Sequence, residues 1–193
     1  MKRMMRMLVL TGALAFVLAP GQAQADGFVT PWVGSAFGSS FSNGQTSFGI
    51  DLGGMGAGVI GGELDFGYSP SFFGTKSDFG SNTVMDLMGN LILGVPVGGT
   101  HGPGVRPYLT AGAGLLRTQI DGGTLAKVSS SNNMLGWNVG AGVMGYFSDH
   151  VGLRGDVRYL RGFKDTNTGV TSIDLSGSGQ LHFWRASVGV VLR

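Results

Sequence analysis

The sequence predicts an all-β protein, an eight-stranded antiparallel up-and-down transmembrane β-barrel preceded by a cleavable signal peptide. Eight segments alternate apolar residues with small or polar ones, and a period of two is that of a strand with two different faces. The lysines after the leader, Lys76, Lys127 and Lys164, all fall between these segments. The connections alternate between long and short, as they do in membrane-spanning barrels.

The leader occupies residues 1–25. A basic start, Met1 to Arg6, precedes an apolar run of twelve residues from Leu8 to Ala19, and Ala23-Gln-Ala25 has the pattern of a cleavage site. The run is shorter than the roughly 20 residues that a transmembrane helix needs. We therefore expect cleavage after Ala25 and a barrel domain over residues 26–193.

Composition excludes several classes of function. Without the leader, thirteen basic residues become ten against eleven acidic ones, so the formal net charge changes from +2 to −1 and nucleic-acid binding is not expected. Cysteine is absent, and the three histidines, at positions 101, 150 and 182, are far apart and lack metal-ligand spacing. No cofactor and no metal are expected. The 37 glycines have no collagen period and disfavour helix.

Each predicted strand is long enough, or nearly so, for the roughly 9–11 residues that cross a bilayer at a tilt. The eight ranges are 27–37, 47–55, 59–68, 83–95, 106–117, 133–147, 151–161 and 181–192. Four long polar connections (39–46, 69–82, 118–132 and 162–180) alternate with shorter turns (56–58, 96–105 and 148–150). This alternation places both chain ends at the short-turn end. The phase of the first strand is ambiguous.

Alternation alone does not distinguish a membrane barrel from a soluble lipocalin-like one, whose apolar face points inward. A solvated exterior would carry many charges of both signs, whereas here the polar face is mostly Gly, Ser and Asn. In addition, aromatic residues gather at the loop-side end of the apolar face, as in an interfacial girdle. These predicted girdle residues are Phe37, Phe48, Tyr68, Trp137, Tyr159 and Trp184. Both observations favour the membrane.

Three segments carry a resemblance to a known family. Residues 106–115 (RPYLTAGAGL), 136–147 (GWNVGAGVMGYF) and 151–159 (VGLRGDVRY) resemble the opacity-type, OmpA-like eight-stranded outer-membrane barrels. The resemblance covers residues 27–193 and implies location in the outer membrane of a diderm bacterium and insertion by the barrel-assembly machinery. Family members typically end in Phe, whereas this chain ends in Leu192-Arg193. No peptidoglycan-binding domain is expected after the barrel.

Other motifs have simpler explanations. Residues 56–61 (GAGVIG) and 140–145 (GAGVMG) match G-x-G-x-x-G, but a dinucleotide site needs a helix after the glycines, and strand-like sequence surrounds both. They indicate a tight hairpin and a crowded lumen. Arg154-Gly-Asp156 spells an adhesion tripeptide but lies in mid-strand. His182 has no nearby catalytic partner in the sequence, so we expect no enzymatic activity.

The inward charges predict an ion network. Acidic residues cluster on the second to fourth strands and arginines on the last two, so closing the sheet sets the two groups across a narrow interior. An isolated buried ion costs several kcal/mol, and these groups must therefore pair. The predicted members are Asp51, Glu63, Asp65, Asp86, Arg154, Asp156, Arg158 and Arg185.

Two functions remain open at this stage. The first is a structural or surface protein whose lumen is plugged, and the second is a narrow channel for small or apolar solutes. Arg117, Arg161 and Lys164 at the loop-side ends predict contact with lipopolysaccharide phosphates, although ordinary solvated strand ends would have the same sequence. The sequence does not identify an extracellular ligand.

Overall fold

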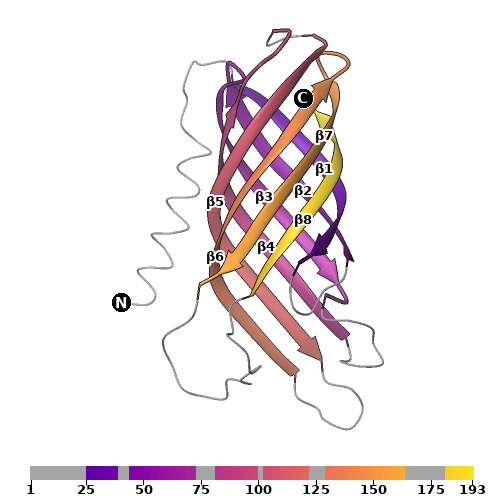
Figure 1. Ribbon diagram of the computed structural model, residues 1–193, viewed down its shortest axis with the longest axis vertical. Coiled ribbons are helices and arrows are strands. Elements are labelled where there is room, and N and C mark those ends of the chain that lie inside the picture. Colours follow the sequence, from indigo (N-terminus) through magenta and orange to yellow (C-terminus); the bar gives the residue numbers. More distant parts are fainter. Residues whose placement is uncertain (1–24, 39–43, 73–80, 100–101, 122–128, 164–180) are drawn as a thin grey trace.

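The computed structural model describes residues 25–38, 44–72, 81–99, 102–121, 129–163 and 181–193. Eight strands form one closed barrel in which each pairs with its neighbours in chain order and β1 pairs with β8 (Figure 1). All neighbours run antiparallel. The strands are β1 (Ala25–Phe37), β2 (Gln45–Gly56), β3 (Ile60–Pro70), β4 (Ser81–Gly94), β5 (Gly104–Asp121), β6 (Ser129–Tyr146), β7 (Val151–Gly162) and β8 (His182–Leu192).

The predicted fold and all eight strands are confirmed, with one difference at the loop-side end. β5 and β6 continue their pairing as far as Asp121 and Ser129, so much of the expected loop over 118–132 is strand. Two strands that pair outside a bilayer need only backbone hydrogen bonds between them. Polar residues can form such a pair without the apolar alternation that marks a membrane-spanning strand. This hairpin therefore extends past its neighbours (Figure 1).

The turn after β2 shows why the first glycine-rich motif lies there. Ala57 and Gly58 both have positive φ, 48° and 69°, and Val59 N donates to Gly56 O at 3.0 Å. Two successive positive φ values make the type I′ geometry that matches strand twist in two-residue hairpins. The motif is a tight hairpin, as predicted, and not a nucleotide loop.

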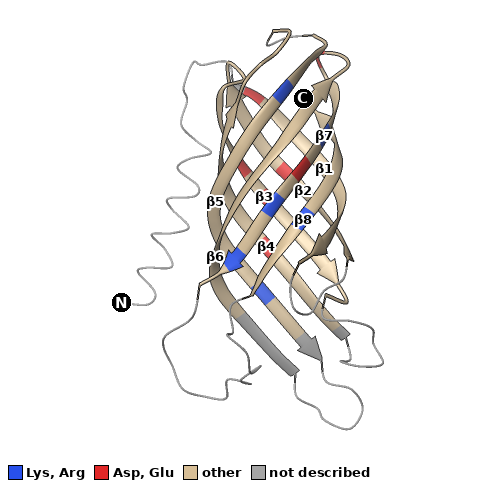
Figure 2. Ribbon diagram, viewed as in Figure 1, with Lys and Arg blue, Asp and Glu red and all other residues tan. Residues whose placement is uncertain are grey.

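Faces alternate along every strand. β7 is typical: Val151, Leu153 and Val157 are exposed, whereas Arg154 and Asp156 between them are buried. Pairing with β2 and β8 resolves the phase of β1, with Phe28, Thr30 and Trp32 inside and Val29 and Val33 outside. Large exposed apolar residues cover the outer wall, and most of the charged strand residues, whose positions Figure 2 marks, are buried. Among the described residues, no helix is long and apolar enough to cross a membrane.

Candidate functional site: a buried ion network in the lumen

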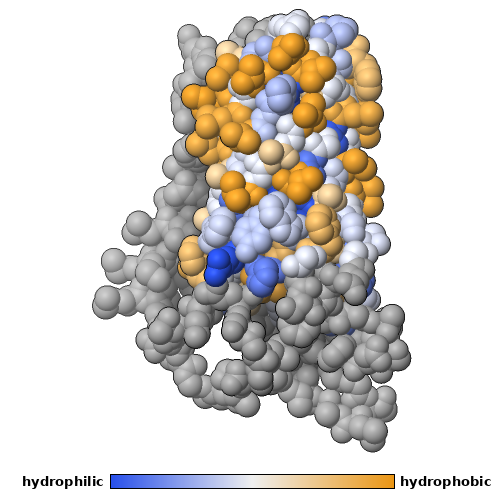
Figure 3. Space-filling view, viewed as in Figure 1, coloured by the Kyte–Doolittle hydropathy of each residue, from blue (hydrophilic) through white to orange (hydrophobic). Residues whose placement is uncertain are grey.

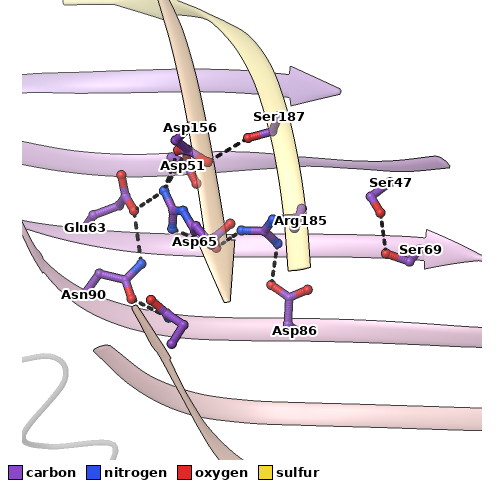
Figure 4. Close-up of polar contacts among 12 residues, drawn as sticks. Ser47, Asp51, Glu63, Asp65, Ser69, Asp86, Asn90, Asp156, Arg185 and Ser187 are labelled. Atoms are coloured by element: carbon purple, nitrogen blue, oxygen red, sulfur yellow. Dashed lines mark hydrogen bonds and ion pairs between the residues drawn. The ribbon is translucent and has the colours of Figure 1, made fainter. Parts of the chain in front are cut away.

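The lumen contains a network of five carboxylates and three guanidinium groups, all buried. Asp51, Glu63, Asp65 and Asp86 come from β2, β3 and β4, and their side chains point across the interior toward β7 and β8 (Figure 4). Neighbours along one wall have the same charge: Asp51 pairs in register with Asp65, and Arg158 with Arg185. Opposite charges therefore meet across the lumen.

Arg154 binds the turn-side part of the network. Its Nη1 lies 2.5 Å from Glu63 Oε2 and 3.2 Å from Asp51 Oδ2, and its Nε donates to Asp156 Oδ2 at 3.1 Å. The guanidinium also lies 4.8 Å from the centre of the Tyr108 ring, and Nε donates to Tyr108 Oη at 2.6 Å. Arg154 thus holds three carboxylates from β2, β3 and its own strand.

Arg158 and Arg185 bind the loop-side part. Arg158 reaches Asp65 and Glu63, each at 2.9 Å, and Asp156 at 3.0 Å. Arg185 pairs with Asp65 and with Asp86, the latter at 2.9 Å, and its guanidinium lies 4.3 Å from the Trp32 ring. The fixed fork of an arginine suits such multiple carboxylate contacts better than a lysine ammonium.

Neutral side chains carry the network around the rest of the wall. Asn90 donates to Glu63 Oε1 at 3.0 Å, and Asn138 on β6 donates to Asn90 at 2.7 Å. On the other side, Tyr108 Oη and Ser187 Oγ donate to the two oxygens of Asp156, at 2.8 and 2.9 Å. The sequence analysis did not include Tyr108, although this residue has the same parity along β5 as the inward Arg106.

Clusters of buried apolar residues lie at both ends of the network, a feature that the sequence analysis missed; in the turn-side cluster the buried Arg106 contacts Met55 and Tyr146. The turn-side layer consists of Phe28, Met55, Ile92, Tyr108, Met144, Tyr146 and Val191. The loop-side layer consists of Ala36, Phe72, Val84, Met88, Leu116, Leu160 and Phe183. Parity along β4 would have revealed part of this, because Met88 and Ile92 lie on the same face as Asp86 and Asn90.

Phe72 was not recognisable from any strand pattern. β3 ends at Pro70, and Ser71 then adopts a left-handed conformation with φ 54°. The chain thereby directs Phe72 into the loop-side layer, where its ring packs edge-on against Phe183 with centroids 5.0 Å apart. A residue outside the strands therefore belongs to the loop-side layer.

Inward glycines make room for the large inward side chains of neighbouring strands. Gly67 is the register partner of Asp86, and a Cβ at Gly67 would lie 2.4 Å from Asp86 Oδ1. Gly140 has the same relation to Arg158, with 2.8 Å to its Cγ. These glycines thus leave room in a lumen that holds eight ionisable side chains.

Residues 11–193 match the model of the outer membrane protein beta-barrel domain. The chain belongs to this family. It is a protein of the bacterial outer membrane, and lipid surrounds its apolar outer wall. None of the curated proteins has a significantly similar sequence.

Solved outer-membrane barrels share the fold. Neisserial surface protein A is 19% identical, with a TM-score of 0.64 over 86% of this chain and 96% of that one. The N-terminal barrel of Pseudomonas aeruginosa OprF is 18% identical, with a TM-score of 0.53 over 88% and 98%. Ail of Yersinia pestis, in complex with the heparin analogue sucrose octasulfate, is 12% identical, with a TM-score of 0.50 over 86% and 99%. At these identities the likeness concerns the fold alone.

On this outer-membrane barrel, the six aromatic residues predicted as a girdle point outward near the loop-side end. Trp137, Tyr159 and Trp184 form a continuous group, with centroid distances of 5.7 and 5.1 Å. Phe37 is the register partner of Trp184, while Phe48 lies 5.2 Å from Tyr68 on the adjoining strands. Their role as an interfacial girdle stays a prediction.

The predicted lipopolysaccharide-contact residues lie at the same end. Arg161 is exposed and is the register partner of both Trp137 and His182. Arg117 is also exposed and lies four residues beyond Ala113, the partner of Trp137, toward the loops. Lys164 falls outside the described residues.

Within the described part of the chain, no group of three or more acidic, His or Cys side chains could hold a metal ion.

Proposed function

We propose that this outer-membrane barrel is a non-enzymatic protein with a structural or surface role, whose lumen is plugged by the ion network. The observation that carries the proposal is the order of layers inside the barrel: apolar, ionic, apolar. Contacts with other molecules are then made by the outer wall and the loop-side end rather than through the lumen.

The layered interior opposes conduction in two ways. Arg154 and Arg158 cross the lumen to reach Glu63 on the opposite wall, so their ion pairs span the bore. An ion would also have to leave water in order to pass the apolar layers, at a cost of several kcal/mol. Eight strands enclose an interior that side chains can fill, and the buried side chains of the network and of the two apolar clusters support a filled lumen here.

The same geometry supports the absence of catalysis. Each carboxylate of the network lies within 4 Å of an arginine and away from solvent, so none is positioned as a general base for a substrate. His182 is exposed on the outer wall, and its ring lies 6.4 Å from Tyr159. Its placement suits an interfacial polar residue.

At the outer rim, the proposed partner is lipopolysaccharide. Arg117 and Arg161 are exposed at the loop-side end of an outer wall that is otherwise apolar, where a long cationic side chain reaches anionic phosphates from the edge of the hydrocarbon. During insertion, the proposed partner is the barrel-assembly machinery. We further propose that the leader is cleaved after Ala25, so that the mature chain begins at Asp26.

Planar-bilayer recordings on the refolded full barrel test the closed lumen. We expect no steady openings from the parent protein. Steady openings, or swelling of protein-containing vesicles in a small neutral sugar, would refute the plugged lumen and favour the alternative, a narrow channel for small or apolar solutes. If an Arg154→Ala variant conducts ions while the parent does not, the ion network is what blocks conduction through the lumen.

A further inference from the structure

A groove crosses the lipid-facing wall where the barrel closes. It extends over β6, β7, β8 and β1, has a volume of about 700 Å³, and begins beside Phe147 at the turn-side end. A second hollow of about 340 Å³ shares Val33 and Val188 with it and continues to Ala186. In the space-filling view, pale residues lie between orange apolar ones on the visible face of the barrel (Figure 3).

Two outward glycines form the floor of the groove. A Cβ at Gly145 would meet no atom within 4 Å, and one at Gly155 would meet only Ser187 O at 4.0 Å. These differ from inward glycines such as Gly67, whose missing Cβ is replaced by a neighbouring side chain. Their register partners are the exposed Leu153, Val143 and Val188, which form the sides.

The groove also coincides with an interruption of the β1–β8 ladder. The register pairs Val29 with Leu192 and resumes only at Trp32 with Gly189. Pro31, which lines the groove, lies between these pairs and has no N–H to donate. Backbone pairing between β1 and β8 is therefore incomplete beside the groove.

We infer that this groove binds one acyl chain of a phospholipid from the periplasmic leaflet. Family membership places the wall in the outer membrane, so lipid is the medium that covers it. Short turns are periplasmic in such barrels, and the groove opens at the turn-side end. From Phe147 to Val143 it follows the turn-side end of β6 for about 13 Å along the strand. At a strand tilt of about 40° this is about 10 Å along the membrane normal, which lies within one leaflet, about 15 Å deep.

The lining matches a hydrocarbon chain in chemistry as well as in length. Leu153, Val188 and Val190 present exposed apolar side chains along the groove, and the glycines let a chain approach the backbone closely. A chain held there gains van der Waals contact with these side chains as well as with the backbone at the glycines. The groove thus selects one lipid from the annulus.

Native mass spectrometry of the full barrel, extracted from vesicles of phosphatidylethanolamine and phosphatidylglycerol, tests the inference. We expect the parent to retain one phospholipid per chain. Gly145→Leu with Gly155→Leu should lower the retained fraction about tenfold, equivalent to about 1.4 kcal/mol. The matched control is Gly89→Leu, because Gly89 also faces lipid and has its nearest neighbour at 3.8 Å, yet lies outside the groove.

Heat-modified gel mobility first establishes that each variant is folded. If the leucine pair does not fold, Gly145→Ala with Gly155→Ala decides, because each adds a single methyl group to open space and should still reduce retention. Equal retention by parent and groove variants, or loss of lipid by Gly89→Leu to the same extent, would overturn the site. Detection of paired copies in place of the lipid would assign the groove to a dimer and refute the proposal.

Discussion

Arg158 and Arg185 are direct cross-strand neighbours on β7 and β8, and one carboxylate from the far wall joins them. Asp65 Oδ2 lies 2.9 Å from Arg158 Nη1 and also accepts from Arg185 Nη2. Because Asp65 lies on β3, it offsets the repulsion between the two arginines only when the barrel is closed, whereas Asp156 pairs with Arg158 within β7 itself. The network therefore favours the closed barrel over an open sheet.

Loss of Arg154 should strongly destabilise the barrel. Arg154→Ala leaves Glu63 without its 2.5 Å partner and weakens the pairing of Asp51, so we expect the free energy of unfolding to fall by about 3–5 kcal/mol. Urea unfolding in vesicles, followed by tryptophan fluorescence, measures it. Arg117→Ala, at an exposed position, should change stability by no more than about 0.5 kcal/mol. A variant as stable as the parent would contradict the network's structural role.

The carboxylates should differ in importance. Glu63 makes ion pairs of 2.5 and 2.9 Å and accepts from Asn90, whereas Asp51 lies 3.2 and 3.8 Å from its arginines. We therefore expect Glu63→Gln to destabilise the barrel more than Asp51→Asn, by at least about 1 kcal/mol. The same urea titration compares the two isosteric changes, and the reverse order would refute this ranking.

Glycine substitutions should separate the lumen from the lipid face. At Gly67 a new Cβ would lie 2.4 Å from Asp86 Oδ1 and 2.6 Å from Arg185 Nη1, so Gly67→Ala should displace this ion pair and cost about 1–3 kcal/mol. Gly89→Ala meets nothing closer than 3.8 Å and should be nearly neutral. Thermal unfolding of the two variants side by side gives the comparison. Equal effects would mean that the lumen is not tightly packed.

Lipopolysaccharide should affect folding through the rim arginines. We expect Arg117→Ala combined with Arg161→Ala to remove most of the dependence of the refolding rate on lipopolysaccharide, because phosphate contacts are lost. Rates are measured in vesicles with and without lipopolysaccharide, and vesicles without it provide the control, in which variant and parent should refold alike. Unchanged dependence in the double variant would eliminate the proposed contact.

Cleavage of the leader has a direct test. N-terminal sequencing of the protein from the outer-membrane fraction should begin at Asp26. A sequence that begins at Met1 would show that residues 1–25 are retained, contrary to the proposal.

Strand parity carried most of what was predictable about the lumen. The side-chain period of a strand is a local property, so the inward position of Arg154, Asp156 and Arg158 followed from alternation alone. The same alternation also places Met88 and Leu160 on the inward face. They were not recognised as lumen residues, because the lumen was expected to be polar. β1 was ambiguous because Phe28, Thr30 and Trp32, which face inward, include two large apolar residues.

Which residues form ion pairs across the lumen, by contrast, depends on the register between the strands. Each strand is staggered against the next, and the offsets add up around the closed barrel. Which carboxylate meets which arginine therefore could not be read from the chain, and neither could the stacking of Arg185 on Trp32 across the β1–β8 seam.

By itself, the sequence determined the number of strands, the two faces and the opposed groups of charge, because these follow from a two-residue period and from the exclusion of charge from hydrocarbon. Only the closed structure decided how the interior is layered, how Phe72 enters it, and where the outer wall is hollowed at Gly145 and Gly155. Those features arise between segments distant in the chain, where packing in three dimensions, and not local periodicity, selects the neighbours.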